Sequence, residues 1–406
     1  MTLPPVPDLR TVQLDLVEAQ IKTLLVRFEG SAISDKEFWE MQFDLGLAWV
    51  GFPLGFGGLG VSPSLQEHIG NRLREAEAPS NFLRNPIGIG MGAPTVLVHA
   101  SADLAKRLLK PIFTCDEIWC QLFSEPGAGS DVASVRTSAV RDGDEWIING
   151  QKVWTTLAHV SKWGMLLTRT DITVSKHAGM TYFILDMESP GVEIRPLRQM
   201  TGDAEFNEVY FTDVRIPDSH RLGNVGDGWA TALTTLMNER VSLGGTTAER
   251  ESGPIGDAVR IWKELNSRLP HDRDRLAQLW IEAEVSRLTN IRASQMRMAG
   301  TPGPEGSVGK LISAELNKKI YEFCINLLGP QAMTYASYEM KRPGSIKIER
   351  EDGSFDVSKA FLRSRANSIE GGTSEIMKNI LGERVLGLPR EPRSDHNIAF
   401  SQLAKS

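Results

Sequence analysis

Several features are scarce in this chain of 406 residues, and each scarcity excludes a class of protein. Its three cysteines, Cys115, Cys120 and Cys324, match no metal spacing, and the histidines show none either, so no metal is expected. An odd, sparse set of cysteines indicates free thiols in a reducing compartment. No apolar run is long enough to span a bilayer. The first residues, MTLPPVPDLR, do not resemble a secretory signal, so cytoplasmic residence is the expected default.

An excess of basic residues is also absent. Lys plus Arg total 45 against 51 Asp plus Glu, which gives a formal net charge of -6. Proteins that bind nucleic acid in general carry a basic footprint, so this class is excluded. Local arginine clusters can still bind an anionic ligand within an acidic protein. The hydrophobic fraction of 41% is enough for sizeable cores, and the length indicates two or three domains.

The pattern of apolar residues and turn signals changes twice along the chain. Residues 1–117 predict an N-terminal helical domain, because apolar residues recur there at helical spacing. Residues 118–225 predict a β-domain, because short apolar runs alternate with turn signals such as Asp142-Gly143 and Asn149-Gly150. Residues 226–406 predict a C-terminal helical domain. The order helix, sheet, helix therefore predicts an α+β fold.

Within the C-terminal part, apolar residues from Val308 to Leu327 recur every three or four positions and predict one face of a helix. A linker at Gly300–Gly306 is expected before this helix. The polar insert Lys341–Asp356 predicts an exposed loop or hairpin. The basic run Arg363-Ser364-Arg365 is typical of a solvated helix face, with contact to an anionic ligand as the alternative.

The most informative segment runs from Gln121 to Thr156. Its turn Ser124–Asp131 reads SEPGAGSD, and such a small, glycine-rich turn offers backbone N–H groups and hydroxyls to a flat polar ligand. The segment Trp154-Thr155-Thr156 adds a ring for stacking and hydroxyl donors. The turn alone would more often be a structural loop, but the combination suits a bound heteroaromatic cofactor.

These residues resemble the flavin-binding signature of the acyl-CoA dehydrogenase family. Ser368–Pro389, SIEGGTSEIMKNILGERVLGLP, resembles the second signature of that family, and Leu47–Gly60 resembles its early loop. The resemblance implies an N-terminal helical domain, a middle β-barrel-like domain and a C-terminal four-helix bundle. It also implies FAD-dependent dehydrogenation of an acyl-CoA thioester between Cα and Cβ, in which a carboxylate removes the α-proton and a hydride passes to the flavin. An electron-transferring flavoprotein would then reoxidise the cofactor.

The ending Ile380–Pro389 looks most like the actinobacterial branch of the family. Members of that branch often act on branched, bulky or sterol-derived acyl-CoA thioesters, in fatty-acid or sterol degradation. The family's site residues carry over by position. Phe123, Ser124, Gly129 and Ser130 are expected to line the flavin or the thioester, Trp154 and Thr156 to touch the isoalloxazine, and Thr373 and Glu375 to lie near its ribityl-phosphate side.

The second signature lacks the general base that many family members carry. The matching position is Gly371, and Glu370 stands one residue too early, so its side chain is expected to point the other way. The long-chain and isovaleryl types carry the base in a Glu-Arg pair on a helix, which Glu239 and Arg240 match. Glu239 is therefore the expected base, Arg240 is expected to hold the substrate or flavin side, and Gly371 to donate its N–H to the thioester carbonyl. The plain alternative makes Glu239 a solvated carboxylate paired with a neighbouring arginine.

The adenylate half of the FAD site departs from the family pattern. The Arg-x-x-Phe-Gly motif is missing, with only Arg260, Arg273 or Arg275 as substitutes, and Gln-x-x-Gly-Gly appears as Asn326–Pro330. One interpretation is FAD bound with altered contacts in a homo-dimer or tetramer. Another is a non-catalytic or half-site subunit of a hetero-oligomer, completed by a second acyl-CoA dehydrogenase-like chain. Apart from the adenylate half, a further alternative for the function is another flavoprotein on the same scaffold, such as an oxidase or monooxygenase that lets O₂ reach the flavin.

Overall fold

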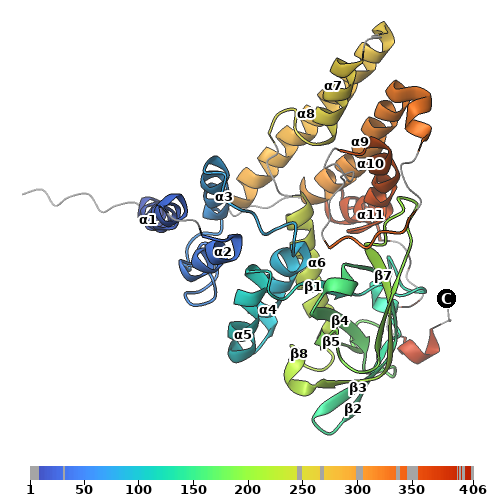
Figure 1. Cartoon of the computed structure of the whole chain (residues 1–406). Coiled ribbons are helices and arrows are strands. Elements are labelled where there is room, and N and C mark those ends of the chain that lie inside the picture. Colours follow the sequence, from blue (N-terminus) through green and yellow to red (C-terminus); the bar gives the residue numbers. More distant parts are fainter. Residues whose placement is uncertain are drawn as a thin grey trace, which may run out of the picture.

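The computed structural model describes residues 9–30, 33–244, 249–265, 269–298, 305–334, 339–344, 355–390, 392, 395 and 398–403. Helices come first, then a sheet, then helices again, which confirms the α+β fold (Figure 1). The first group contains α1 (Leu9–Gly30), α2 (Asp35–Asp44), α3 (Leu65–Glu75), α4 (Ala93–His99) and α5 (Ala102–Phe113). None of the described helices is both long enough and apolar enough to cross a membrane.

The middle of the chain forms one sheet. Its strands are β1 (Trp119–Leu122), β2 (Ser138–Asp142), β3 (Glu145–Thr156), β4 (Trp163–Arg169), β5 (Met180–Asp186), β6 (Val192–Pro196), β7 (Phe206–Pro217) and β8 (Arg221–Leu222). The order is β6-β7-β3-β2-β4-β5-β8, with β1 paired to β4. The long pair β3 and β7 runs antiparallel and carries most of the residues that matter for the site.

One predicted turn in this sheet is confirmed and one is wrong. Gly143, with φ of 67°, lies in the turn between β2 and β3, as the Asp142-Gly143 signal predicted. Asn149-Gly150 forms no turn, because both residues lie inside β3, where the register with β7 shifts between Ile148 and Gly150. The glycine is needed for space, since a Cβ at Gly150 would lie 2.7 Å from the Cα of Thr137.

The C-terminal helices are α6 (Gly228–Gly244), α7 (Pro254–Glu264), α8 (Pro270–Met298), α9 (Glu305–Leu328), α10 (Val357–Arg363) and α11 (Ser374–Arg384). The helix predicted from Val308 to Leu327 is α9, whose buried residues Leu316, Ile320 and Phe323 share a core with residues of α7, α8 and α10. The predicted linker Gly300–Gly306 lies largely outside the described residues, and its last two residues begin α9.

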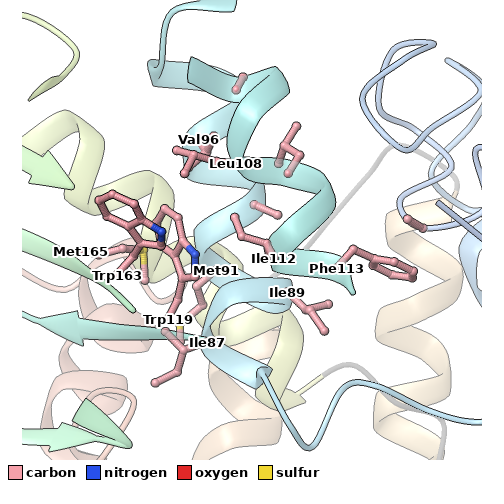
Figure 2. Close-up of a cluster of buried hydrophobic side chains, with 14 of the residues drawn as sticks. Ile87, Ile89, Met91, Val96, Leu108, Ile112, Phe113, Trp119, Trp163 and Met165 are labelled. Atoms are coloured by element: carbon pink, nitrogen blue, oxygen red, sulfur yellow. The ribbon is translucent and has the colours of Figure 1, made fainter. Parts of the chain in front are cut away.

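Helix α6 occupies the centre of the molecule (Figure 1). It packs against the π-helical turn Gly88–Gly92 and α4, against β4 and β5, and against α9. Figure 2 shows the core that joins the first helices to the sheet, where the rings of Trp119 and Trp163 lie with their centroids 6.5 Å apart beside Met91 and Met165. Helix α6 is therefore held by helices on two sides and by the sheet on another.

Candidate active site

The glycine-rich turn Ser124–Asp131 is fixed from beneath by a buried ion pair. Glu125 accepts hydrogen bonds from the backbone N–H groups of Arg136 at 2.7 Å and Thr137 at 2.9 Å. The Nζ atom of Lys152, whose side chain is fully buried, donates to Glu125 Oε1 at 2.8 Å and to the carbonyl of Phe123 at 2.9 Å. The glutamate of the signature therefore supports the turn rather than facing a ligand.

The charges of this pair are set by burial and by each other. Burial alone would raise the pKa of Glu125, but Lys152 and the hydrogen bonds outweigh it and hold this pKa below its ordinary value. Burial lowers the pKa of Lys152 to about 8, against the opposing effect of Glu125. Both groups are thus charged at neutral pH. Sequence reasoning did not single out Lys152, although a lysine among the apolar residues of a predicted strand was a signal.

The other face of the turn is open. Gly129 and Ser130 are exposed, and a Cβ at Gly129 would meet nothing within 4 Å. The carbonyl of Ser124 accepts from the N–H of Val153 at 2.9 Å, which places the turn directly beside Trp154. Phe123 turns its ring into the core, edge-on to Tyr182 with centroids 5.7 Å apart. The exposed backbone and hydroxyls of this turn are thus available to a ligand.

Trp154 presents its ring to the outside of β3. Its φ is 60°, an uncommon value for a bulky residue, and it lies where the pairing of β3 with β7 shifts between Lys152 and Thr155. The side chain is 60% exposed and stands edge-on to Phe206, with centroids 6.0 Å apart. Thr156 pairs with Phe206 and is half-buried. The Oγ1 atom of Thr155 is buried without a hydrogen-bond partner in the described structure.

The second signature contains a loop that leads into α11, and two glycines of this loop adopt left-handed backbone conformations. Gly371 and Gly372 have φ values of 64° and 89°, which glycine adopts without strain. Thr373 caps the helix, because its Oγ1 accepts from the N–H of Ile376 at 3.1 Å. Glu375 is exposed in the first turn of α11. The loop thus ends on the N-terminus of a helix, where an anionic group is favoured.

Glu239 lies on α6 and is half-buried. Lys310 of α9 is near it. Burial lowers the pKa of Lys310, and the carboxylates of Glu370 and Glu239 oppose that shift. The Nζ atom of Lys310 also donates to the carbonyl of Asn367 at 2.6 Å, in the loop before Gly371. The side chain of Arg240 lies outside the described part of the structure. Lys310, which the sequence did not point to, therefore lies close both to the candidate base and to the second signature.

Both oxygens of Glu370 are already engaged. Arg363, the last residue of α10, donates from Nη1 to Oε1 at 3.1 Å and from Nη2 to Oε2 at 2.9 Å. The side-chain amide of Asn367 donates to Oε1 at 2.9 Å. A third Arg363 donor, Nε, reaches Oε1 of Glu205 at 2.9 Å. The solvated helix face predicted for Arg363 is wrong, since its side chain is only 17% exposed.

These contacts join the two signatures into one site. Trp154 stands on Phe206, and the Arg363 guanidinium lies 5.3 Å from the Phe206 ring centroid. Arg363 in turn holds Glu370, next to Gly371. A continuous set of described side chains therefore leads from the outer face of β3 to the glycine loop.

The arginines considered for the adenylate half make local contacts. Arg260 pairs along its own helix with Asp257 at 3.4 Å and Glu264 at 3.6 Å. Arg275 donates to Gln278 at 3.3 Å, and Arg273 is exposed. Asn326 lies in α9, and Gly329, with φ of 57°, follows its end. The described contacts of Arg260 and Arg275 are thus with residues of their own helices.

Comparison with known proteins agrees with the geometry. Two protein-family models match the sequence. The acyl-CoA dehydrogenase middle domain matches residues 120–214, and the acyl-CoA dehydrogenase C-terminal domain matches residues 226–386. Acyl-CoA dehydrogenase IpdE1 of Mycobacterium tuberculosis is 35% identical over 378 residues, which cover 90% of this chain and 91% of that protein. Acyl-CoA dehydrogenase FadE34 of the same organism is 38% identical over 364 residues, covering 89% of this chain and 47% of that longer protein.

A solved structure shows the same architecture. The ChsE4-ChsE5 complex from Mycobacterium tuberculosis matches with a TM-score of 0.68 and 28% identity, over 96% of this chain and 100% of the matched one. Its likeness extends through the helices before the sheet, the sheet and the helices after it. This chain therefore belongs to the acyl-CoA dehydrogenase family and is an oxidoreductase that acts on acyl-CoA.

Proposed function

We propose that the chain is an FAD-dependent enzyme that introduces the Cα–Cβ double bond into a branched or bulky acyl-CoA thioester, with Glu239 as the base. The observation that carries this proposal is the junction of the two signatures through Trp154, Phe206, Arg363 and Glu370. A flat cofactor bound on β3 would, in this proposal, face the loop that contains Gly371 and lie near α6.

The residues on the outer face of β3 fit a flavin. The exposed ring of Trp154 offers a stacking surface, and the open space above Gly129 lets a ring approach the backbone. The unpartnered Oγ1 of Thr155 and the half-buried Thr156 are hydroxyls beside that ring. Ser124, Ser130 and the N-terminus of α11 with Thr373 and Glu375 would complete the contacts. When bound there, FAD supplies the acceptor for the hydride from Cβ.

The resemblance assigns the base to Glu239, and the contacts of Glu370 argue against Glu370 in that role. Glu370 is held by Arg363 and Asn367 through both oxygens, so it would have to break an ion pair to accept a proton. Glu239 is half-buried on α6 and lies near Lys310. The N–H of Gly371 would polarise the thioester carbonyl, and this role needs no side chain. Arg240 would hold the substrate or flavin side of the pocket.

The acyl group is proposed to be branched or sterol-derived. Support comes from the likeness of Ile380–Pro389 to the actinobacterial branch and from the mycobacterial relatives. A glycine at position 371, where many family members carry a glutamate, also leaves more room beside the thioester. An electron-transferring flavoprotein is the proposed electron acceptor, and a homo-dimer or tetramer the proposed assembly.

A second candidate is a half-site subunit of a hetero-oligomer. The missing Arg-x-x-Phe-Gly motif favours it, because the adenylate half of the site then lacks residues that most family members supply. The ChsE4-ChsE5 match favours it too, since that structure is a complex of two differently named chains. In this case a second chain would complete the adenylate half of the FAD site.

Anaerobic titration of the purified protein tests the proposal. The protein is expected to be yellow when expressed alone, and one member of a panel of straight, branched and steroid-side-chain CoA thioesters should bleach it. Slow return of the yellow flavin colour in air would indicate a dehydrogenase, whereas a rapid return would indicate an oxidase. A protein that is colourless alone and yellow only after co-expression with a second family member would support the half-site subunit. A yellow protein that no thioester bleaches would contradict the proposed reaction.

A further inference from the structure

We infer that Arg363 is a positioning residue that sets the distance and angle between the flavin-facing strand and the Gly371 loop. This inference rests on the proposed function, since it assigns Trp154 to the cofactor and Gly371 to the thioester. Arg363 acts through the two carboxylates that it holds.

The three donors of Arg363 reach two separate parts of the fold. Nε bonds to Glu205, which directly precedes β7, at 2.9 Å. Nη1 and Nη2 bond to the two oxygens of Glu370, in the loop between α10 and α11, at 3.1 and 2.9 Å. A guanidinium is planar and its donors are fixed in one fork, so these bonds also fix the relative orientation of the two carboxylates.

Each carboxylate is directly followed by a residue of the candidate site. After Glu205 comes Phe206, whose ring supports Trp154 edge-on and lies 5.3 Å from the guanidinium carbon. After Glu370 comes Gly371, with φ of 64°. A shift of Arg363 would therefore move the stacking surface of the cofactor and the N–H donor of the thioester relative to each other.

The ion pair between Arg363 and Glu205 is buried enough to hold α10 rigidly against the start of β7. The side chain of Glu205 is 8% exposed and that of Arg363 17% exposed. Burial raises the pKa of Glu205, and Arg363 opposes this shift. Because a buried carboxylate without its partner is costly, the pair is expected to stay closed in the native enzyme. A lysine at position 363 would keep the charge but could not form the forked bond with Glu370.

If Arg363 had a purely structural role, it would be one of several residues of α10 that form ion pairs with the segment before β7. Lys359, one turn earlier on α10, provides the comparison. It forms an ion pair with Asp203, whose side chain is 9% exposed, across the same interface. Asp203 is separated from Phe206 by two residues and touches neither Trp154 nor the Gly371 loop among the described contacts. Lys359→Met therefore removes an ion pair of similar burial and leaves the bonds of Arg363 to Glu205 and Glu370 in place, at the cost of an unpaired Asp203 carboxylate.

The test compares Arg363→Lys with Lys359→Met in the FAD-loaded enzyme. Two readouts are used: the visible absorption spectrum of bound FAD, and kcat and KM with the CoA thioester that bleaches the wild type fastest. Arg363→Lys should shift the flavin spectrum and lower kcat about 10²-fold, as expected for a misplaced reacting group, with KM changed far less. Lys359→Met should keep the spectrum and kcat of the wild type.

The inference is overturned if both variants lose the same amount of kcat, or if neither shifts the spectrum. If Arg363→Lys does not fold, Glu370→Ala serves instead, because it removes both acceptor oxygens from the loop while leaving Arg363 bound to Glu205. It should lower kcat with a folded, yellow protein, and wild-type kcat in this variant would also overturn the inference. Failure of the wild type to be bleached by any thioester is a different outcome, since it rejects the proposed function itself.

Discussion

His159 shows how a single residue fixes its own charge state through its neighbours. Its Nε2 faces the carbonyl of Pro343 at 3.1 Å, and its Nδ1 faces the side-chain amide of Asn207 at 3.3 Å. A neutral imidazole that carries its proton on Nε2 satisfies both contacts. Burial lowers the pKa of His159, and the nearby Arg342 lowers it further. The same Asn207 amide donates to the carbonyl of Thr155, so this histidine supports the site strand from behind.

Acidification should therefore weaken the fold through His159. Its folded-state pKa lies below the unfolded value of about 6.5, so its contribution to stability is complete above that pH. The contribution is lost as the pH falls from about 6.5 through the folded-state pKa. Urea unfolding between pH 7.5 and 5 should show this loss, and His159→Gln should reduce the slope. His271→Gln, at a histidine whose side chain is 75% exposed, is the control. An unchanged slope in His159→Gln would rule out this assignment.

At the scale of the element, strand β3 departs from the simple alternation of buried and exposed side chains at the candidate site. Lys152 and Val153 are both buried, and Trp154 turns outward with a positive φ. The bulge allows Lys152 to support the glycine-rich turn from inside while the Trp154 side chain points outward. Hydrophobic patterning located this strand but not its bulge, because the pattern assumes a side-chain period of two. The wrong turn predicted at Asn149-Gly150 has another cause, because Asn-Gly is a turn signal in most sequences but here lies at a register shift inside β3.

Removing the buried cation of β3 should be costly. Lys152→Met leaves Glu125 as a buried, unpaired carboxylate and should lower the free energy of unfolding by about 3–5 kcal/mol. The double variant Glu125→Gln with Lys152→Met should recover part of this loss, because position 125 no longer carries a buried carboxylate without Lys152. Urea unfolding of the three proteins measures both effects. A single variant within about 1 kcal/mol of the wild type would contradict the structural role assigned to the pair.

At the scale of the whole molecule, the sequence motifs predicted which segments form the candidate site. They did not predict the side-chain contacts that hold these segments together. The two signatures and the helical periodicity of α9 follow from local residue patterns. Arg363, Glu205 and Lys310 stand outside any local pattern that marks a function. Their roles arise from contacts such as Arg363 with Glu205 and Lys310 with Asn367, which join segments far apart in sequence. Arg363 was even predicted to face solvent, because a short basic run on a helix usually does.

The candidate base depends on the assembly of the whole molecule. Glu239 is carried by α6, which packs against the first helices, the sheet and α9. Trp154 belongs to the sheet, and Gly371 to the loop before α11. Trp154 comes from the sheet, whereas Glu239 and Gly371 come from the C-terminal helical part. The three can act on one substrate only when α6 is held in a fixed position relative to the sheet and to the Gly371 loop.

The most direct test is therefore anaerobic stopped-flow reduction of the bound flavin in Glu239→Gln, beside the wild type and Glu249→Gln, a control at an exposed glutamate. The CoA thioester is the one that bleaches the wild type. Loss of a general base should slow flavin reduction in Glu239→Gln about 10²–10⁴-fold, while FAD stays bound and the flavin spectrum is unchanged. Glu249→Gln should reduce its flavin as fast as the wild type does. A wild-type rate of reduction in Glu239→Gln would contradict the account.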